Sequence, residues 1–132
     1  MSTLVIDTIQ GKTTAGSVNV RGEGSNNTNL QQGLAKSWVN LDGTDSGAAA
    51  RDSFNVASTT DVGTGNYSCT FTNNMSNDDY ANNVTGRGST VVFGSINDGK
   101  YATSTVGIYL FNTSGSLTDA TYAITSVHGD LA

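Results

Sequence analysis

The chain has 132 residues, a length that suits one domain or one domain with an appended segment. Its formal net charge is -5, and its six Lys and Arg residues are scattered. Such a chain cannot neutralise a row of phosphates, so nucleic acid and anionic membrane surfaces are excluded as expected partners. Nearly half of the residues are Thr, Asn, Ser and Gly, only 13% are charged, and proline is absent. This composition is typical of strands and turns rather than of disorder.

Segment 2–10 alternates apolar side chains on both faces and predicts a strand, as does 17–21. Residues 13–16 predict a turn between them, and 21–29 predict a loop because they include no apolar residue. We therefore interpret residues 1–29 as an N-terminal β arm and linker, serving as an anchor or an inter-subunit contact. A lone two-stranded hairpin is marginally stable, so this arm is expected to pair with another surface.

Residues 30–132 are predicted to form one β domain. Segment 29–36 can make one helical turn, 35–41 is a strand with Trp38 on the face opposite Val39 and Leu41, and 48–51 can make a short helical turn. Segment 53–58 predicts a strand with Phe54 and Val56 inward. The glycine-rich residues 61–66 then reverse the chain into a strand at 67–72. Its inward side chains are Tyr67, Cys69 and Phe71.

Further strands are predicted at 80–86, 89–96, 101–111 and 121–129, with a turn at 97–100. About nine short strands separated by turn signals predict an all-β fold, an antiparallel β-sandwich or jelly-roll-like domain. Cys69 is the single cysteine, which excludes an internal disulfide. The N-terminal residues do not resemble a signal peptide, and no stretch approaches 18 apolar residues, so membrane insertion is not expected.

Few residues in the sequence are candidates for catalysis or for binding a metal ion or a phosphate. His128, the single histidine, has no nucleophile signature nearby, and a half-exposed position at a strand end is the simpler interpretation. Turn aspartates could offer oxygen ligands to calcium, although they usually accept backbone hydrogen bonds in their own turns. These are Asp42, Asp45, Asp52, Asp78 and Asp79. The glycine pairs at 63–65 and 86–88 lack the spacing of phosphate-binding loops and indicate turns.

Aromatic side chains leave two alternatives open, a stacking surface for sugars or core packing. They are Trp38, Tyr67, Tyr80, Tyr101 and Tyr109. No set of residues has the pattern of a catalytic, cofactor-binding or metal site. We therefore predict that the protein is not an enzyme and uses no cofactor.

Two motifs carry a resemblance to a known family. "GLAKSWVNLDGT" and "RDSFNVASTTDVGTGNYSCTFTNNM", followed by a tyrosine after an Asp pair, resemble a tail-fibre-type module of virion appendages in tailed, marine-type bacteriophages. Its pattern is "AKxWVNFxGTG … IRDSFNVSSxTDNGTGxYTVxFTxxM … Y". The segment before it is similar to the lead-in of that module, so the resemblance covers about residues 3–85. Leu41 replaces the usual Phe, and Cys69 lies in the second hairpin strand.

The resemblance implies a structural protein of a bacteriophage virion, assembled in the host bacterial cytoplasm and forming a homotrimer. In the first hypothesis it is a fibre- or spike-like appendage that contacts host surface glycans and is held by other virion proteins through the N-terminal arm. The alternative is a capsid decoration (cement) protein that stabilises or coats the head. The short chain favours the alternative, whereas the family pattern favours the first.

Overall fold

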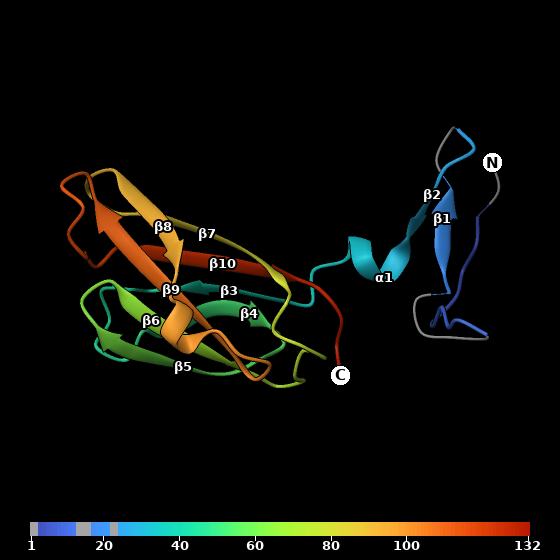
Figure 1. The fold of residues 1–132 in the computed structure, drawn as a ribbon, viewed down its shortest axis with the longest axis horizontal. Coiled ribbons are helices and arrows are strands. Elements are labelled where there is room, and N and C mark those ends of the chain that lie inside the picture. Colours follow the sequence, from blue (N-terminus) through green and yellow to red (C-terminus); the bar gives the residue numbers. More distant parts are fainter. Residues whose placement is uncertain (1–2, 13–16, 22–23) are drawn as a thin grey trace. The chain divides into compact units, whose positions relative to one another are not determined.

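The computed structural model describes residues 3–12, 17–21 and 24–132, so the turn predicted at 13–16 lies outside the described residues. The chain divides into two compact units, Met1–Leu34 and Ala35–Ala132 (Figure 1).

The N-terminal unit contains a small hairpin and one helical turn. Strand β1 (Asn19–Arg21) pairs antiparallel with β2 (Asn27–Asn29), so the second strand lies within the segment predicted to be a loop. The predicted helical turn is confirmed as α1 (Leu30–Gly33). It begins at Asn29, whose side chain accepts a hydrogen bond from the Gln32 backbone N–H at 3.1 Å, which satisfies one of the free N–H groups at the start of the helix.

The strand predicted at 2–10 is wrong for the described residues 3–10, which have no strand pairing. Leu4 and Val5 point to opposite faces in an extended chain, and within the structure they are 79% and 87% exposed. A segment with apolar groups on both faces becomes a stable strand only when both faces are covered. The small N-terminal unit does not supply that cover.

The C-terminal unit is a sandwich of two four-stranded antiparallel sheets, which confirms the predicted all-β fold. The strands are β3 (Ser37–Leu41), β4 (Ala50–Phe54), β5 (Val56–Gly63), β6 (Asn66–Phe71), β7 (Ala81–Arg87), β8 (Val92–Ile96), β9 (Thr105–Asn112) and β10 (Tyr122–His128), with a 3₁₀ turn η1 (Asp98–Lys100). One sheet has the order β4-β3-β10-β7 and the other β5-β6-β9-β8. The chain crosses between the sheets four times, from β4 to β5, from β6 to β7, from β7 to β8 and from β9 to β10 (Figure 1).

The core lies between the two sheets and follows the period-two alternation of the strands. In β3, Val39 and Leu41 are buried while Trp38 faces outward, as predicted. In β6, Tyr67, Cys69 and Phe71 are buried, which confirms their predicted inward orientation. Strands β9 and β10 complete the core with the buried side chains Val106, Ile108, Leu110, Ala123 and Val127. Each large aliphatic side chain removed from water in this way contributes about 1.5–3 kcal/mol.

Asn55 turns the chain from one sheet into the other. Its φ of 57° places it in the left-handed region, and its side chain accepts from the Asn73 N–H at 2.7 Å and donates to the Lys36 carbonyl at 2.9 Å. The alternation therefore breaks between Phe54 and Val56. Phe54 ends β4 and is 53% exposed on the outer face opposite Trp38, so its predicted inward orientation is wrong. Val56 packs against the core.

The helical turn predicted at 48–51 is also wrong. Ala48 is buried with a φ of 47°, and the chain then enters β4, which pairs with β3. Four residues cannot hold a helix without tertiary support, and pairing with β3 satisfies the backbone of this segment instead.

The hairpin of β5 and β6 is confirmed. Gly65 has a φ of 61°, and a Cβ there would lie 2.6 Å from the Leu110 carbonyl oxygen, so this turn requires glycine. The pairing shifts register between Val56 and Ser58 and again between Asp61 and Gly63. A similar shift occurs where β4 pairs with β3. The outer strands β4 and β5 are therefore both irregular.

Candidate functional site

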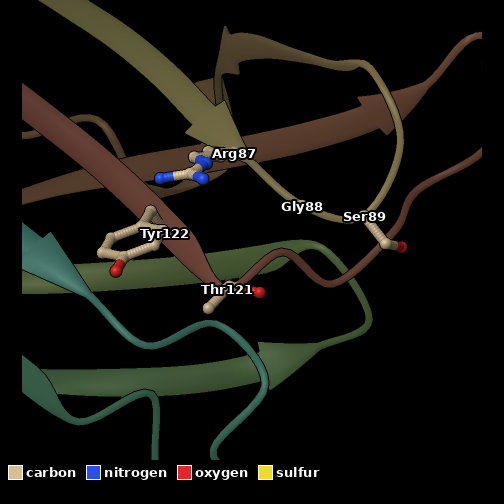
Figure 2. A pocket seen from close by; sticks show the side chains of 5 residues that line it. All are labelled: Arg87, Gly88, Ser89, Thr121 and Tyr122. Atoms are coloured by element: carbon tan, nitrogen blue, oxygen red, sulfur yellow. The ribbon is translucent and has the colours of Figure 1, made fainter.

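A pocket of about 250 Å³ opens where β7 ends and β10 begins. Its lining consists of Arg87, Gly88, Ser89, Thr121 and Tyr122. Figure 2 shows the Arg87 guanidinium beside the Tyr122 ring, with Ser89 on the loop that leaves β7. The pocket therefore combines a cation, an aromatic ring and several hydroxyl groups.

Strand pairing brings the two largest side chains of this pocket together. Arg87 and Tyr122 are directly opposite each other in the β7–β10 ladder, although 35 positions separate them in the sequence (122 − 87). Residues directly opposite in an antiparallel pair point to the same face. Gly86 occupies the inner face, where the Leu110 side chain lies 3.0 Å from the position of a Cβ, and the next residue, Arg87, consequently points outward.

Two arginines contact the Tyr122 ring. The Arg51 Cζ lies 4.7 Å from the ring centroid and the Arg87 Cζ lies 5.7 Å from it. Both distances fall within the range of about 6 Å in which a guanidinium is attracted to the ring. The ring therefore places two cations close to one another at the end of this sheet.

The charges of the two arginines are compensated differently. The Arg51 Nη2 lies 2.5 Å from the Asp42 Oδ2 and also donates to the Thr121 carbonyl at 2.9 Å. Hydrogen bonds from the Thr44 side chain and backbone, together with the Arg51 charge, hold the pKa of Asp42 below its ordinary value, so this carboxylate stays ionised. Among the described residues Arg87 has no carboxylate partner. The pocket therefore presents one uncompensated positive charge.

The acidic residues considered as calcium ligands do not gather into one site. Asp42 binds Arg51 and Thr44, Asp45 accepts from the Gly47 N–H at 3.1 Å, and Asp52 accepts from the Ser53 N–H at 2.8 Å. These are the local turn and backbone interactions that the sequence suggested as the simpler interpretation. Within the described part of the chain, no three His, Cys, Asp or Glu residues are placed to hold a metal ion. Asp78 and Asp79 are exposed in the segment before β7.

The remaining candidate residues are His128, the aromatic side chains and the two glycine pairs. His128 is half-buried at the end of β10, as expected. Of the aromatic residues, Tyr67 and Tyr80 are in the core, whereas Trp38 is 36% exposed on the outer face of its sheet. The glycines at 63–65 form the predicted turn, but the 86–88 segment is the end of β7 and the start of the pocket rather than a turn.

Sequence reasoning missed Arg87, Ser89, Thr121 and Tyr122 as pocket residues. The nearby signals were "GRGS" and "TY", two short polar segments that come together only through the β7–β10 pairing. A register prediction for these two strands would have found the site, because it places the arginine and the tyrosine opposite each other.

Comparison of the chain with protein-family models, with curated proteins and with solved structures finds no match. The described residues contain no helix with the length and apolar character needed to cross a membrane.

Proposed function

We propose that this chain is a structural protein of a bacteriophage virion and forms a fibre- or spike-like appendage. The sequence pattern that it shares with such modules supports the proposal, because the pattern falls on positions that the fold needs. Asn55 makes the corner between the sheets, Gly65 makes the hairpin turn, and Tyr67 fills the core. A pattern that coincides with such positions indicates a shared fold better than one spread over surface residues.

One observation carries the proposal that the chain belongs to an assembly. Within the N-terminal unit, Leu4, Val5 and Ile9 are 79%, 87% and 59% exposed. These apolar side chains are exposed within one short segment, and exposed apolar surface supports a role of this segment in interaction. In the proposed function this segment attaches the chain to other virion proteins, and the sandwich is the part presented outward.

The outer face of β6 suits contacts between identical copies, and we include a homotrimer in the proposal. The outward side chains of β6 are Asn66, Ser68 and Thr70, which are uncharged. Charged side chains that meet their own images at a symmetry axis repel one another, whereas hydroxyl and amide groups can form hydrogen bonds there. Sedimentation equilibrium of the full chain tests this, since a monomer at all concentrations contradicts the trimer.

Virion incorporation tests the attachment role. A full-length variant with Leu4, Val5 and Ile9 changed to Ser is expected to keep the melting temperature of the sandwich and to be lost from purified particles. The matched control changes Val62 and Val91, which are exposed in the sandwich, to Ser and is expected to be incorporated normally. Normal incorporation of the triple variant would show that this segment is not the anchor.

Copy number separates the appendage from the capsid decoration protein. Quantitative mass spectrometry of purified particles is expected to find a few dozen copies or fewer for an appendage. Hundreds of copies per particle would contradict the appendage and support decoration of the head.

A further inference from the structure

We infer that the pocket beside Arg87 binds the carboxylate of an acidic saccharide. This inference deepens the proposed function, on which it rests for the biological source of the saccharide. The binding itself is a property of the pocket and is measured on the isolated full chain.

The charge of the pocket supports this inference. Arg87 has no carboxylate partner among the described residues, whereas the neighbouring Arg51 is paired with Asp42 at 2.5 Å. The pocket therefore offers one positive charge that a ligand can neutralise. In a chain of net charge -5, a single such charge suits a monoanion better than a phosphate dianion or a dense polyanion.

The geometry of the Arg87 guanidinium also favours a carboxylate. Arg87 extends from a regular strand directly opposite Tyr122, and its Cζ lies 5.7 Å from the centre of that ring. The contact restrains the side chain before any ligand arrives, which lowers the entropic cost of binding. A planar guanidinium donates two parallel hydrogen bonds to a planar carboxylate, and this pairing is stronger and more selective than one with a point charge.

The pocket lining also carries hydroxyl groups. Ser89, Thr121 and Tyr122 line the pocket and each carries a hydroxyl, and in the described part of the chain none of these hydroxyls is bonded to another protein group. In Figure 2 the Tyr122 ring lies beside Arg87, whereas the Ser89 hydroxyl points away from it. Hydroxyl groups donate and accept, so they match the hydroxyl groups of a sugar ring. A simple organic acid would leave most of them without a ligand partner.

The volume of the pocket limits the size of its ligand. The pocket volume of about 250 Å³ lies below the range of about 300–1,000 Å³ that is typical of sites enclosing a drug-sized ligand. One sugar ring with its carboxylate fits such a space. We therefore assign the pocket to a single uronic-acid-type residue within a longer saccharide, whose neighbouring sugars remain outside.

The test is a titration followed by NMR, with a hexasaccharide of alternating glucuronic acid and N-acetylglucosamine as the probe. The same oligosaccharide with its carboxyl groups reduced to alcohols is the neutral control ligand. The acidic probe is expected to shift amide signals of residues 86–89 and 121–122, and the neutral ligand is expected to bind about 10-fold or more weakly, because a hydrogen bond to a charged group is lost.

The variant Arg87→Gln is expected to weaken binding of the acidic probe about 10- to 100-fold for the same reason. Arg21→Gln is the matched control, since it makes the same chemical change at an exposed arginine of the N-terminal unit and is expected to bind like the wild type. Unchanged melting curves and spectra of both variants establish that they fold.

Three results would overturn the inference: no binding of the acidic probe, equal binding of its neutral form, or wild-type affinity of Arg87→Gln. Inorganic phosphate that competes with the probe at equal concentration would show a general anion site and would also overturn it. Failure of the virion proposal would give a different experimental result. A chain that is absent from phage particles but binds the acidic probe through Arg87 would disprove the virion role and leave the pocket assignment standing.

Discussion

Truncation of Phe71 tests how the core is built. Phe71 is 3% exposed and its ring makes an edge-to-face contact with Tyr80 at a centroid distance of 5.9 Å. Removing a buried phenylalanine side chain costs about 3–5 kcal/mol, and loss of the edge-to-face pair accounts for about 0.5–1.5 kcal/mol of such an effect. We therefore expect Phe71→Ala to lower the free energy of unfolding by about 4 kcal/mol.

Phe54→Ala is the matched control, because the side chain is 53% exposed on the outer face and the expected cost is about 1 kcal/mol or less. Urea unfolding should be followed by far-UV circular dichroism rather than by fluorescence, since Trp38 lies directly opposite Phe54 and its emission would change with the substitution. If Phe71→Ala does not fold, Phe71→Leu gives a smaller change of about 1–1.5 kcal/mol to measure. Equal costs at the two phenylalanines would refute the assignment of inner and outer faces.

Urea unfolding also measures three further predictions. Tyr67→Phe removes the hydroxyl that lies 3.0 Å from Asp119 Oδ1, so stability should fall by about 1–3 kcal/mol, and an unchanged midpoint would contradict this role. Burial raises the pKa of the Cys69 thiol to about 12 from 9.0. Because the folded state favours the neutral thiol, the contribution of Cys69 to the free energy of unfolding is complete below about pH 9. It is lost as the pH rises, and the loss is about 1.4 kcal/mol at pH 10. Cys69→Ala should lack this component, and identical alkaline profiles would disprove it. Gly94→Ala should cost about 1–3 kcal/mol because its Cβ would lie 2.5 Å from a backbone oxygen, whereas Gly47→Ala, with 3.9 Å of space, should be nearly neutral.

Local alternation was enough to predict the regular parts of the sandwich. The faces of β3 and β6 followed from single-residue patterns, because each strand has one face in the core and one in solvent. The turn between β5 and β6 was also predictable, since Gly65 occupies a conformation that favours glycine. These features depend on residues that are close in the sequence.

The corner at Asn55 and the pocket could not be found in the same way. The pattern of Phe54 and Val56 is compatible with one continuous strand, and only the hydrogen bonds of Asn55 to Lys36 and Asn73 show that the sheets change there. The pocket depends on the pairing of β7 with β10, which brings distant segments together. Long-range pairing is not encoded in a local period, so neither feature had a usable local signal.

The register shifts in the outer strands β4 and β5 help the folded protein to resist the addition of strands from other chains. An outer strand with regular spacing offers a template of free N–H and carbonyl groups to another chain, and a bulge disrupts that template. On the side of the sandwich formed by β4 and β5, both strands are interrupted. Strand β7 instead pairs without a shift from Ala81 to Arg87. Strand β8, the outer strand of the other sheet, also pairs without a shift from Val92 to Ile96. Unwanted strand addition in concentrated solution is therefore expected at β7 and β8, and a proline at a position whose N–H points away from the sheet is the substitution that would block it.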